Sequence, residues 1–152
     1  MTEYSFIDGL LDSYNPILFV ISIVICIRKA LLRQTHKVIR ICSMFAVSFG
    51  YVYGMFFLDK HVQLWESFGL DYSTHTAFAI AVSMTICSVK QWVEVLMILF
   101  CFYVVGMLFM DFHTVEDIVA TSVVIAIPLF VAQYFIIQKT RLKNMDEVVS
   151  SS

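Results

Sequence analysis

The chain has 152 residues, of which 60% are hydrophobic and 14% are charged, and its formal net charge is −2. Its mean hydropathy of +0.84 excludes an ordinary soluble domain, and no basic patch indicates nucleic-acid binding. We predict one integral-membrane domain over residues 1–152, folded as an all-α, polytopic helix bundle.

Five uncharged windows predict the membrane helices. They cover residues 13–27, 41–58, 72–89, 95–110 and 118–138. A spanning helix needs about 20 largely apolar residues. Three windows fit that requirement directly, and the first and fourth reach it with flanking residues whose apolar stems extend them. We therefore predict about five transmembrane helices.

A proline and a pair of glycines indicate where the first helix starts and how the second one packs. Pro16 suits a first helical turn, so we expect the first helix to start near it. The second helix carries Gly50-x-x-x-Gly54, which allows close approach of another helix. That helix belongs either to the same bundle, which we favour, or to a second copy in a homo-oligomer.

The connection over residues 59–72 is the longest expected on the outer side. Val62, Trp65 and Phe68 recur at three-residue spacing, which predicts a short interfacial helix ended by Gly69.

The last helix contains Pro128, which leaves the carbonyl of Val124 without its helical donor. We expect Thr121 or Ser122 to compensate. Residues 139–152 form a polar tail that we expect to be cytoplasmic and to fray.

Basic residues predict the orientation. With five spans, nine of the ten fall on one side of the membrane, and Lys60 alone falls on the other. The nine are Arg28, Lys29, Arg33, Lys37, Arg40, Lys90, Lys139, Arg141 and Lys143. The positive-inside rule then places the N-terminus outside and the C-terminus in the cytoplasm.

Two histidines are the candidate catalytic groups. His75 follows Ser73 at the start of the third predicted helix, and His113 precedes Asp117 by four residues at the start of the fifth. Charge counting puts both on the outer side. On a helix, a spacing of four residues places His113 and Asp117 on one face.

Such a set suits the cleavage of a phosphate ester. His113 would attack phosphorus, and Asp117 would hold its imidazole in one tautomer. His75 would protonate the leaving alkoxide, and Ser73 would donate to a phosphoryl oxygen.

Simpler interpretations remain for each motif. Ser73 would cap its helix through Thr76, and Thr114 would form a capping box with Asp117. A metal ion held by His75, His113 and Asp117 is a weaker alternative. We predict neither metal nor cofactor.

The two motifs together resemble those of the type 2 phosphatidic acid phosphatase superfamily. In that family an S-x-H motif opens one membrane helix, and H-x-x-x-D opens the next helix but one. The resemblance implies a lipid substrate, His113 as nucleophile, Asp117 as its orienting base and His75 as the acid. The chain lacks the family's Lys/Arg motifs, so the resemblance implies a divergent member. The alternative is a catalytically inactive relative that binds lipid or assists membrane assembly.

The charges of the outer side indicate the kind of head group. Lys60 stands against Glu66, Asp71 and Asp111, with aromatic residues nearby. Acidic and aromatic groups suit an ammonium head group, and a phosphodiester needs fewer cations than a phosphomonoester. We therefore predict Ser73, Lys60, Asp71 and Glu66 as substrate-binding residues of a lipid phosphotransferase or phosphodiester-cleaving enzyme.

Overall fold

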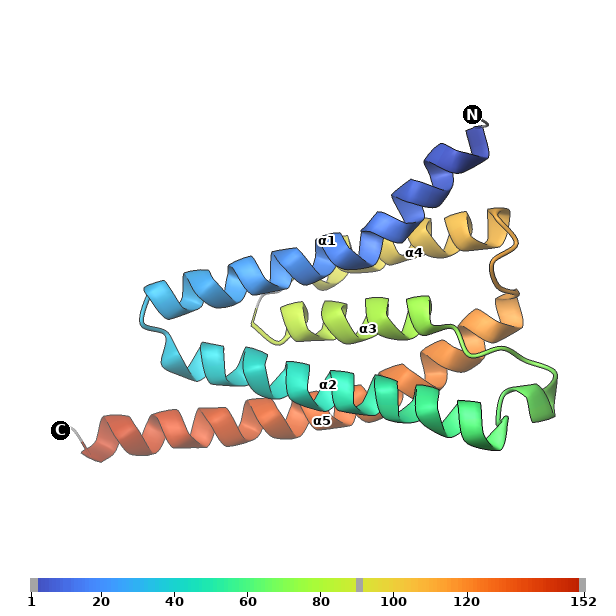
Figure 1. Cartoon of the computed structure of the whole chain (residues 1–152). Helices are drawn as coiled ribbons and strands as arrows, with labels where there is room; N and C mark the ends of the chain where they lie inside the picture. Colours follow the sequence, from blue (N-terminus) through green and yellow to red (C-terminus); the bar gives the residue numbers. More distant parts are fainter. Residues whose placement is uncertain (1–2, 90–91, 151–152) are drawn as a thin grey trace.

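The computed structural model describes residues 3–89 and 92–150 and is helical throughout, apart from the connections (Figure 1). The elements are α1 (Glu3–Leu31), α2 (Thr35–Val62), the short 3-10 helix η1 (Glu66–Phe68), α3 (Thr74–Cys87), α4 (Val93–Phe109) and α5 (Val115–Ser150). These residues contain no strand, so the all-α prediction is confirmed.

In the part of the chain that the structure describes, three helices contain segments long and apolar enough to cross a membrane: Phe6–Leu31, Thr35–Val62 and Val115–Leu142. The apolar helices α3 and α4 are shorter, with 14 and 17 residues. A helix of that length rises only about 21 to 26 Å, against a hydrocarbon core of about 30 Å. The predicted windows were therefore correct as helices, while membrane-crossing length is shown for three of them.

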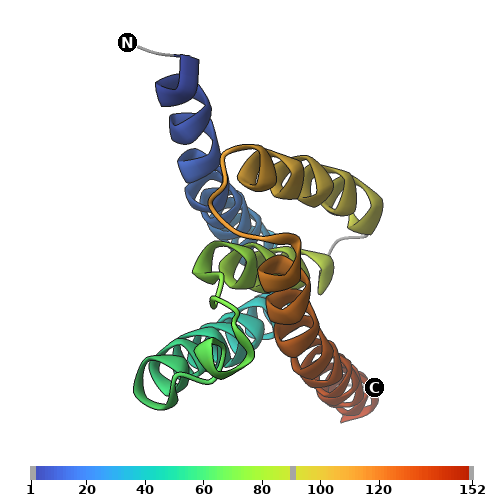
Figure 2. The same cartoon turned by 90° about the vertical axis from the view of Figure 1, so that its right-hand side faces the viewer.

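The short helix α3 lies at the centre of the bundle. It packs against α1, α2 and α5, and α4 lies against α1 and α3 (Figure 2). All three buried apolar clusters include α3 side chains. Ala77, Ala79 and Ala81 are buried, and their small side chains let the surrounding helices approach closely. Because several helices surround α3, its apolar residues are not confined to one stripe.

The first helix starts earlier than predicted. It begins at Glu3, and Pro16 lies in its interior, so the predicted start near Pro16 is wrong. Packing on α4 explains the extra turns, because Leu11 is buried against Gly106, where even a Cβ atom would lie 2.6 Å from the leucine side chain. Burial of this apolar contact offsets the hydrogen bond lost at the proline.

The glycine pair of α2 is not used inside the bundle. Gly50 and Gly54 are exposed, and a Cβ atom at either position would meet nothing within 4 Å. The buried face of α2 instead carries Ser48 and Val52. Each glycine lies two residues beyond one of these, about 200° around the helix. Our preference for packing within the bundle was wrong.

The connection between α2 and α3 is pinned to the end of the bundle. Gly69, with φ of 70°, ends η1 as predicted. Trp65, however, is buried rather than interfacial: its ring packs edge-on against Tyr72 at 4.9 Å, and its backbone N–H donates to Asp59 Oδ1 at 2.8 Å. These contacts fix the segment that leads into Asp71.

The proline of α5 has a partner from another helix. The Tyr51 hydroxyl donates to the carbonyl of Val124 at 3.1 Å, which satisfies the group that Pro128 leaves free. The expected compensation by Thr121 or Ser122 was wrong, since the donor is Tyr51 of α2. The helix continues to Ser150, so the predicted tail is helical up to that residue, and residues 151 and 152 lie outside the described part.

The two ends of the bundle differ in charge. One end holds the turn between α1 and α2, the carboxyl end of α3 and the C-terminal part of α5, with Arg28, Arg33 and Lys139. The opposite end holds the connections that precede α3 and α5 (Figure 1). Both histidine motifs therefore lie at the same end of the molecule, as predicted.

Candidate functional site

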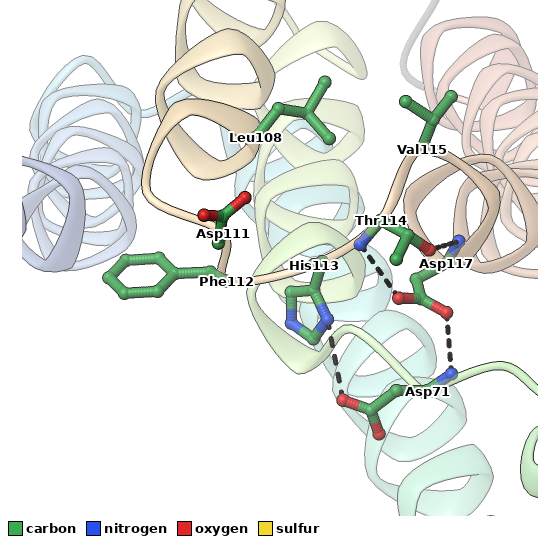
Figure 3. A pocket seen from close by; sticks show the side chains of 8 residues that line it. All are labelled: Asp71, Leu108, Asp111, Phe112, His113, Thr114, Val115 and Asp117. Carbon is green, nitrogen blue, oxygen red and sulfur yellow. Dashed lines mark hydrogen bonds and ion pairs between the residues drawn. The ribbon is translucent and has the colours of Figure 1, made fainter.

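A pocket of about 500 Å³ opens at the end of the bundle that carries the histidine motifs (Figure 3). It lies between the segment preceding α3 and the connection between α4 and α5. Its lining residues are Asp71, Leu108, Asp111, Phe112, His113, Thr114, Val115 and Asp117. Three predicted site residues, His113, Asp117 and Asp71, thus line one pocket.

Thr114 and Asp117 start α5 as a capping box. The N–H of Thr114 donates to Asp117 Oδ2 at 2.9 Å, and the N–H of Asp117 donates to Thr114 Oγ1 at 3.2 Å. The capping interpretation is confirmed. His113 precedes the cap and lies outside the helix, so the expected stacking of His113 and Asp117 on one helical face was wrong. Helical spacing does not apply before the cap, because the cap residue has non-helical backbone angles.

Asp117 also joins the two connections that form the pocket. Its Oδ1 accepts the N–H of Asp71 at 2.7 Å, so both carboxylate oxygens are held by backbone donors from separate segments (Figure 3). The residue is buried. A second link runs nearby, from the N–H of Ser73 to Thr121 Oγ1 at 3.2 Å. Asp117 therefore holds the pocket wall in place, and among the described residues its hydrogen bonds go to Asp71 and Thr114 rather than to the imidazole of His113.

The carboxylate beside His113 belongs to Asp71. His113 Nδ1 lies 3.5 Å from Asp71 Oδ2, and the ring points toward that carboxylate (Figure 3). The distance is that of an ion pair, but Nδ1 makes no hydrogen bond to any described residue. The His113 side chain is 11% exposed and that of Asp71 is 76% exposed. Asp71, predicted as a head-group ligand, thus occupies the place expected for Asp117.

Asp111 is a pocket residue that was not among the predicted site residues. It follows α4 with φ of 53°, a left-handed conformation that aspartate tolerates better than most residues. The sequence signal was its place among the acidic residues of the outer side, two residues before His113. With Asp71 and Asp117 it makes three carboxylates among the eight lining residues, none of which is lysine or arginine. The pocket therefore has a negative potential that favours cationic groups.

Ser73 is fully buried and acts as the cap of α3. Its Oγ accepts the N–H of Thr76 at 3.3 Å and donates to Thr76 Oγ1 at 2.8 Å. The capping interpretation is confirmed here as well. With its hydroxyl engaged in the interior, Ser73 is not part of the pocket wall.

His75 lies in the first turn of α3 with an exposed side chain. The backbone carbonyl of His75 accepts a hydrogen bond from Asn15 Nδ2 at 3.1 Å. His75 is not among the residues lining the pocket. Ala79, one turn later on the same face, shares a cluster with Met107 and Ile118 from the helices beside the pocket. His75 is therefore on the side of α3 that faces these helices.

The remaining predicted ligands lie apart from the pocket. Lys60 is exposed in the last turn of α2, and Glu66 is exposed at the start of η1. Neither lines the pocket. Among the residues that the structure describes, no three His, Cys, Asp or Glu side chains form a group that could hold a metal ion.

The chain matches no family model, no curated protein and no solved structure. The similarity to a lipid phosphatase superfamily is therefore carried by the two short motifs and their order in the chain.

Proposed function

We propose that this protein is an integral-membrane enzyme that hydrolyses or transfers a lipid head group, with His113 as the nucleophile. The observation that carries the proposal is a largely buried histidine beside a carboxylate, in the wall of an open pocket at the end of an apolar bundle. The order of the S-x-H and H-x-x-x-D motifs gives independent support.

The charge distribution supports an extracytoplasmic site. Arg28, Arg33 and Lys139 lie at the end of the bundle opposite the pocket. The positive-inside rule assigns that basic end to the cytoplasm, with five crossings and an outer N-terminus. The pocket then faces the head groups of the outer leaflet.

In the proposed reaction, Nε2 of His113 attacks the phosphorus atom of the lipid phosphodiester. A bond forms between nitrogen and phosphorus, and the bond from phosphorus to the leaving oxygen breaks. Asp71, 3.5 Å from Nδ1, stabilises the positive charge that develops on the imidazole. The oxygen of water or of an acceptor alcohol then attacks the phosphorus atom, and the bond between nitrogen and phosphorus breaks, which restores the imidazole of His113. The proton of the attacking group passes to His75, which gave its own proton to the leaving alkoxide in the first step. His75 is the proposed acid for the alkoxide. Its ring is exposed at the start of α3, outside the pocket lining, and Ala79, one turn further along the same face, packs with residues of α4 and α5.

The pocket charges support a substrate with an ammonium group. A phosphomonoester carries about −1.5 to −2 and normally requires several cations, whereas a phosphodiester carries one negative charge. Asp71 and Asp111 offer carboxylates to an ammonium group, and Phe112 offers an aromatic ring at the pocket edge. Choline and ethanolamine phospholipids are therefore the proposed substrates.

The second candidate function is binding without catalysis. It is favoured by the lack of lysine and arginine among the lining residues, since phosphoryl transfer is usually stabilised by cationic donors. In that case the protein holds an ammonium lipid without cleaving it.

The deciding experiment incubates purified protein with labelled phosphatidic acid and with labelled choline, ethanolamine and inositol phospholipids. We expect turnover of a choline or ethanolamine lipid, reduced by about 10³-fold or more in His113→Ala. His61→Ala is the matched control, because it removes an exposed imidazole at the end of α2. Equal turnover by the His113→Ala and His61→Ala variants contradicts the proposal that His113 is the catalytic nucleophile. Lipid binding without turnover supports the second candidate function, binding without catalysis.

A further inference from the structure

The pocket has two apolar walls that come from different helices. Leu108 belongs to α4 and Val115 to α5. These two helices are consecutive but make little contact, because α4 packs on α1 and α3 while α5 packs on α2 and α3. Near the pocket, Ile118 of α5 packs in one buried cluster with Tyr103 and Met107 of α4. Farther from the pocket, α4 and α5 run apart on either side of α3 (Figure 2).

One side of α5 continues the pocket wall into the apolar region. The carbonyl of Val124 bonds to Tyr51 and marks the side of α5 that faces α2. Val115 and Val119 lie about 180° and 140° around the helix from Val124. Each is 54% exposed. Ala126, two turns below Val119, is small and half-buried and continues this row.

A matching row runs along α4. Gly106 faces α1, where it contacts Leu11. Leu108 and Val104 are each two residues away, about 160° around the helix from Gly106, and are half-buried. Met97, two turns before Val104, is exposed. Both rows are apolar, and each begins at a residue that lines the pocket.

We infer that an acyl chain of the bound lipid lies between these two rows while its head group occupies the pocket. The inference rests on the proposed function only for the identity of the head group. The row from Val115 to Ala126 rises about 16 Å. One leaflet contributes about 15 Å of hydrocarbon, so the row matches the depth that such a chain reaches. The site thus selects an ammonium lipid with long chains over its free, water-soluble head group.

The first test is independent of catalysis. The full chain in lipid nanodiscs receives phosphatidylcholine with a diazirine midway along one acyl chain, and labelled peptides are identified by mass spectrometry. We expect labelling concentrated on residues 97–108 and 115–126, and reduced at least fivefold there by Val119→Trp. Val47→Trp is the matched control, because Val47 is an exposed valine of α2. Labelling spread evenly over α1, α2, α4 and α5 overturns the inference.

The second test separates this inference from the proposed function. Val119→Trp should lower turnover of long-chain phosphatidylcholine at least tenfold and leave that of the dihexanoyl form within twofold of wild type. Equal effects on both lipids, or none, overturn the inference. If wild type turns over neither lipid but labelling remains concentrated on the two rows, the acyl-chain site stands and the catalytic function fails.

Discussion

The starts of α3 and α5 use the same local device and produce opposite outcomes for their histidines. Ser73 caps α3 and His75 comes after it, so His75 lies inside the helix with an exposed ring. Thr114 caps α5 and His113 comes before it, so His113 lies in the connection with a largely buried ring. The position of the cap relative to the histidine therefore decides which imidazole enters the pocket wall.

At these two helix starts, the residues that hold the backbone in place differ from the residues that face the pocket. The buried groups Ser73 and Asp117 hold the two helix starts in place. Asp71, mostly exposed, is the carboxylate close to His113. Substitutions at these three positions should therefore affect stability and activity in different proportions.

The largest effect on stability is expected from Asp117→Ala. This change leaves the N–H groups of Asp71 and Thr114 without an acceptor. We expect the free energy of unfolding to fall by about 3 kcal/mol, since hydrogen bonds to a charged acceptor contribute about 1.5–3 kcal/mol each. Chemical unfolding in detergent measures the loss. Glu116→Ala, at an exposed neighbouring position, is the control, and a loss below about 1 kcal/mol for Asp117→Ala contradicts the assigned role.

An intermediate effect is expected from Ser73→Ala. The change removes the cap of α3 and the hydrogen bond to the buried hydroxyl of Thr76. Loss of such a cap costs about 1 kcal/mol, within a range of about 0.5–2. The same unfolding measurement applies. Ser67→Ala is the control because that hydroxyl is exposed and bonds only within its own turn, to Leu64. Equal stabilities of the two variants would show that the cap of α3 contributes little.

The smallest effect on stability is expected from Asp71→Ala. The backbone N–H that bonds to Asp117 is retained, and the lost carboxylate is exposed, so the free energy of unfolding should change by less than about 1 kcal/mol. Turnover should nevertheless fall by about 10²-fold, because His113 loses the carboxylate beside Nδ1. Unaltered turnover would remove Asp71 from the proposed mechanism. A large loss of stability would make it a structural residue like Asp117.

Features that depend on neighbouring residues in the sequence were predicted well. The five helical windows follow from apolar runs, and the turn at Gly69 follows from its conformational freedom. The helix caps formed by Ser73 and Thr114 were among the alternatives that the sequence offered, because each cap involves residues only three positions apart.

Features that depend on distant residues were missed. The bond between Asp71 and Asp117 joins residues 46 positions apart, and the one from Tyr51 to Val124 joins residues 73 positions apart. Sequence spacing carries no signal for such pairs. The pairing of His113 with Asp71 was missed for a related reason: helical spacing named Asp117, but the cap placed His113 outside the helix.

The sequence by itself determined an all-helical, strongly apolar chain whose two histidine motifs lie at the same end of the bundle, remote from most of the positive charge. These properties follow from local composition and from the alternation of helix direction. Only the tertiary structure decided that Asp71 approaches His113, that Asp117 accepts hydrogen bonds from backbone N–H groups, and that α4 and α5 separate below the pocket. The physical reason is that buried backbone N–H groups must find acceptors, and the packing around α3 determines which carboxylate reaches them.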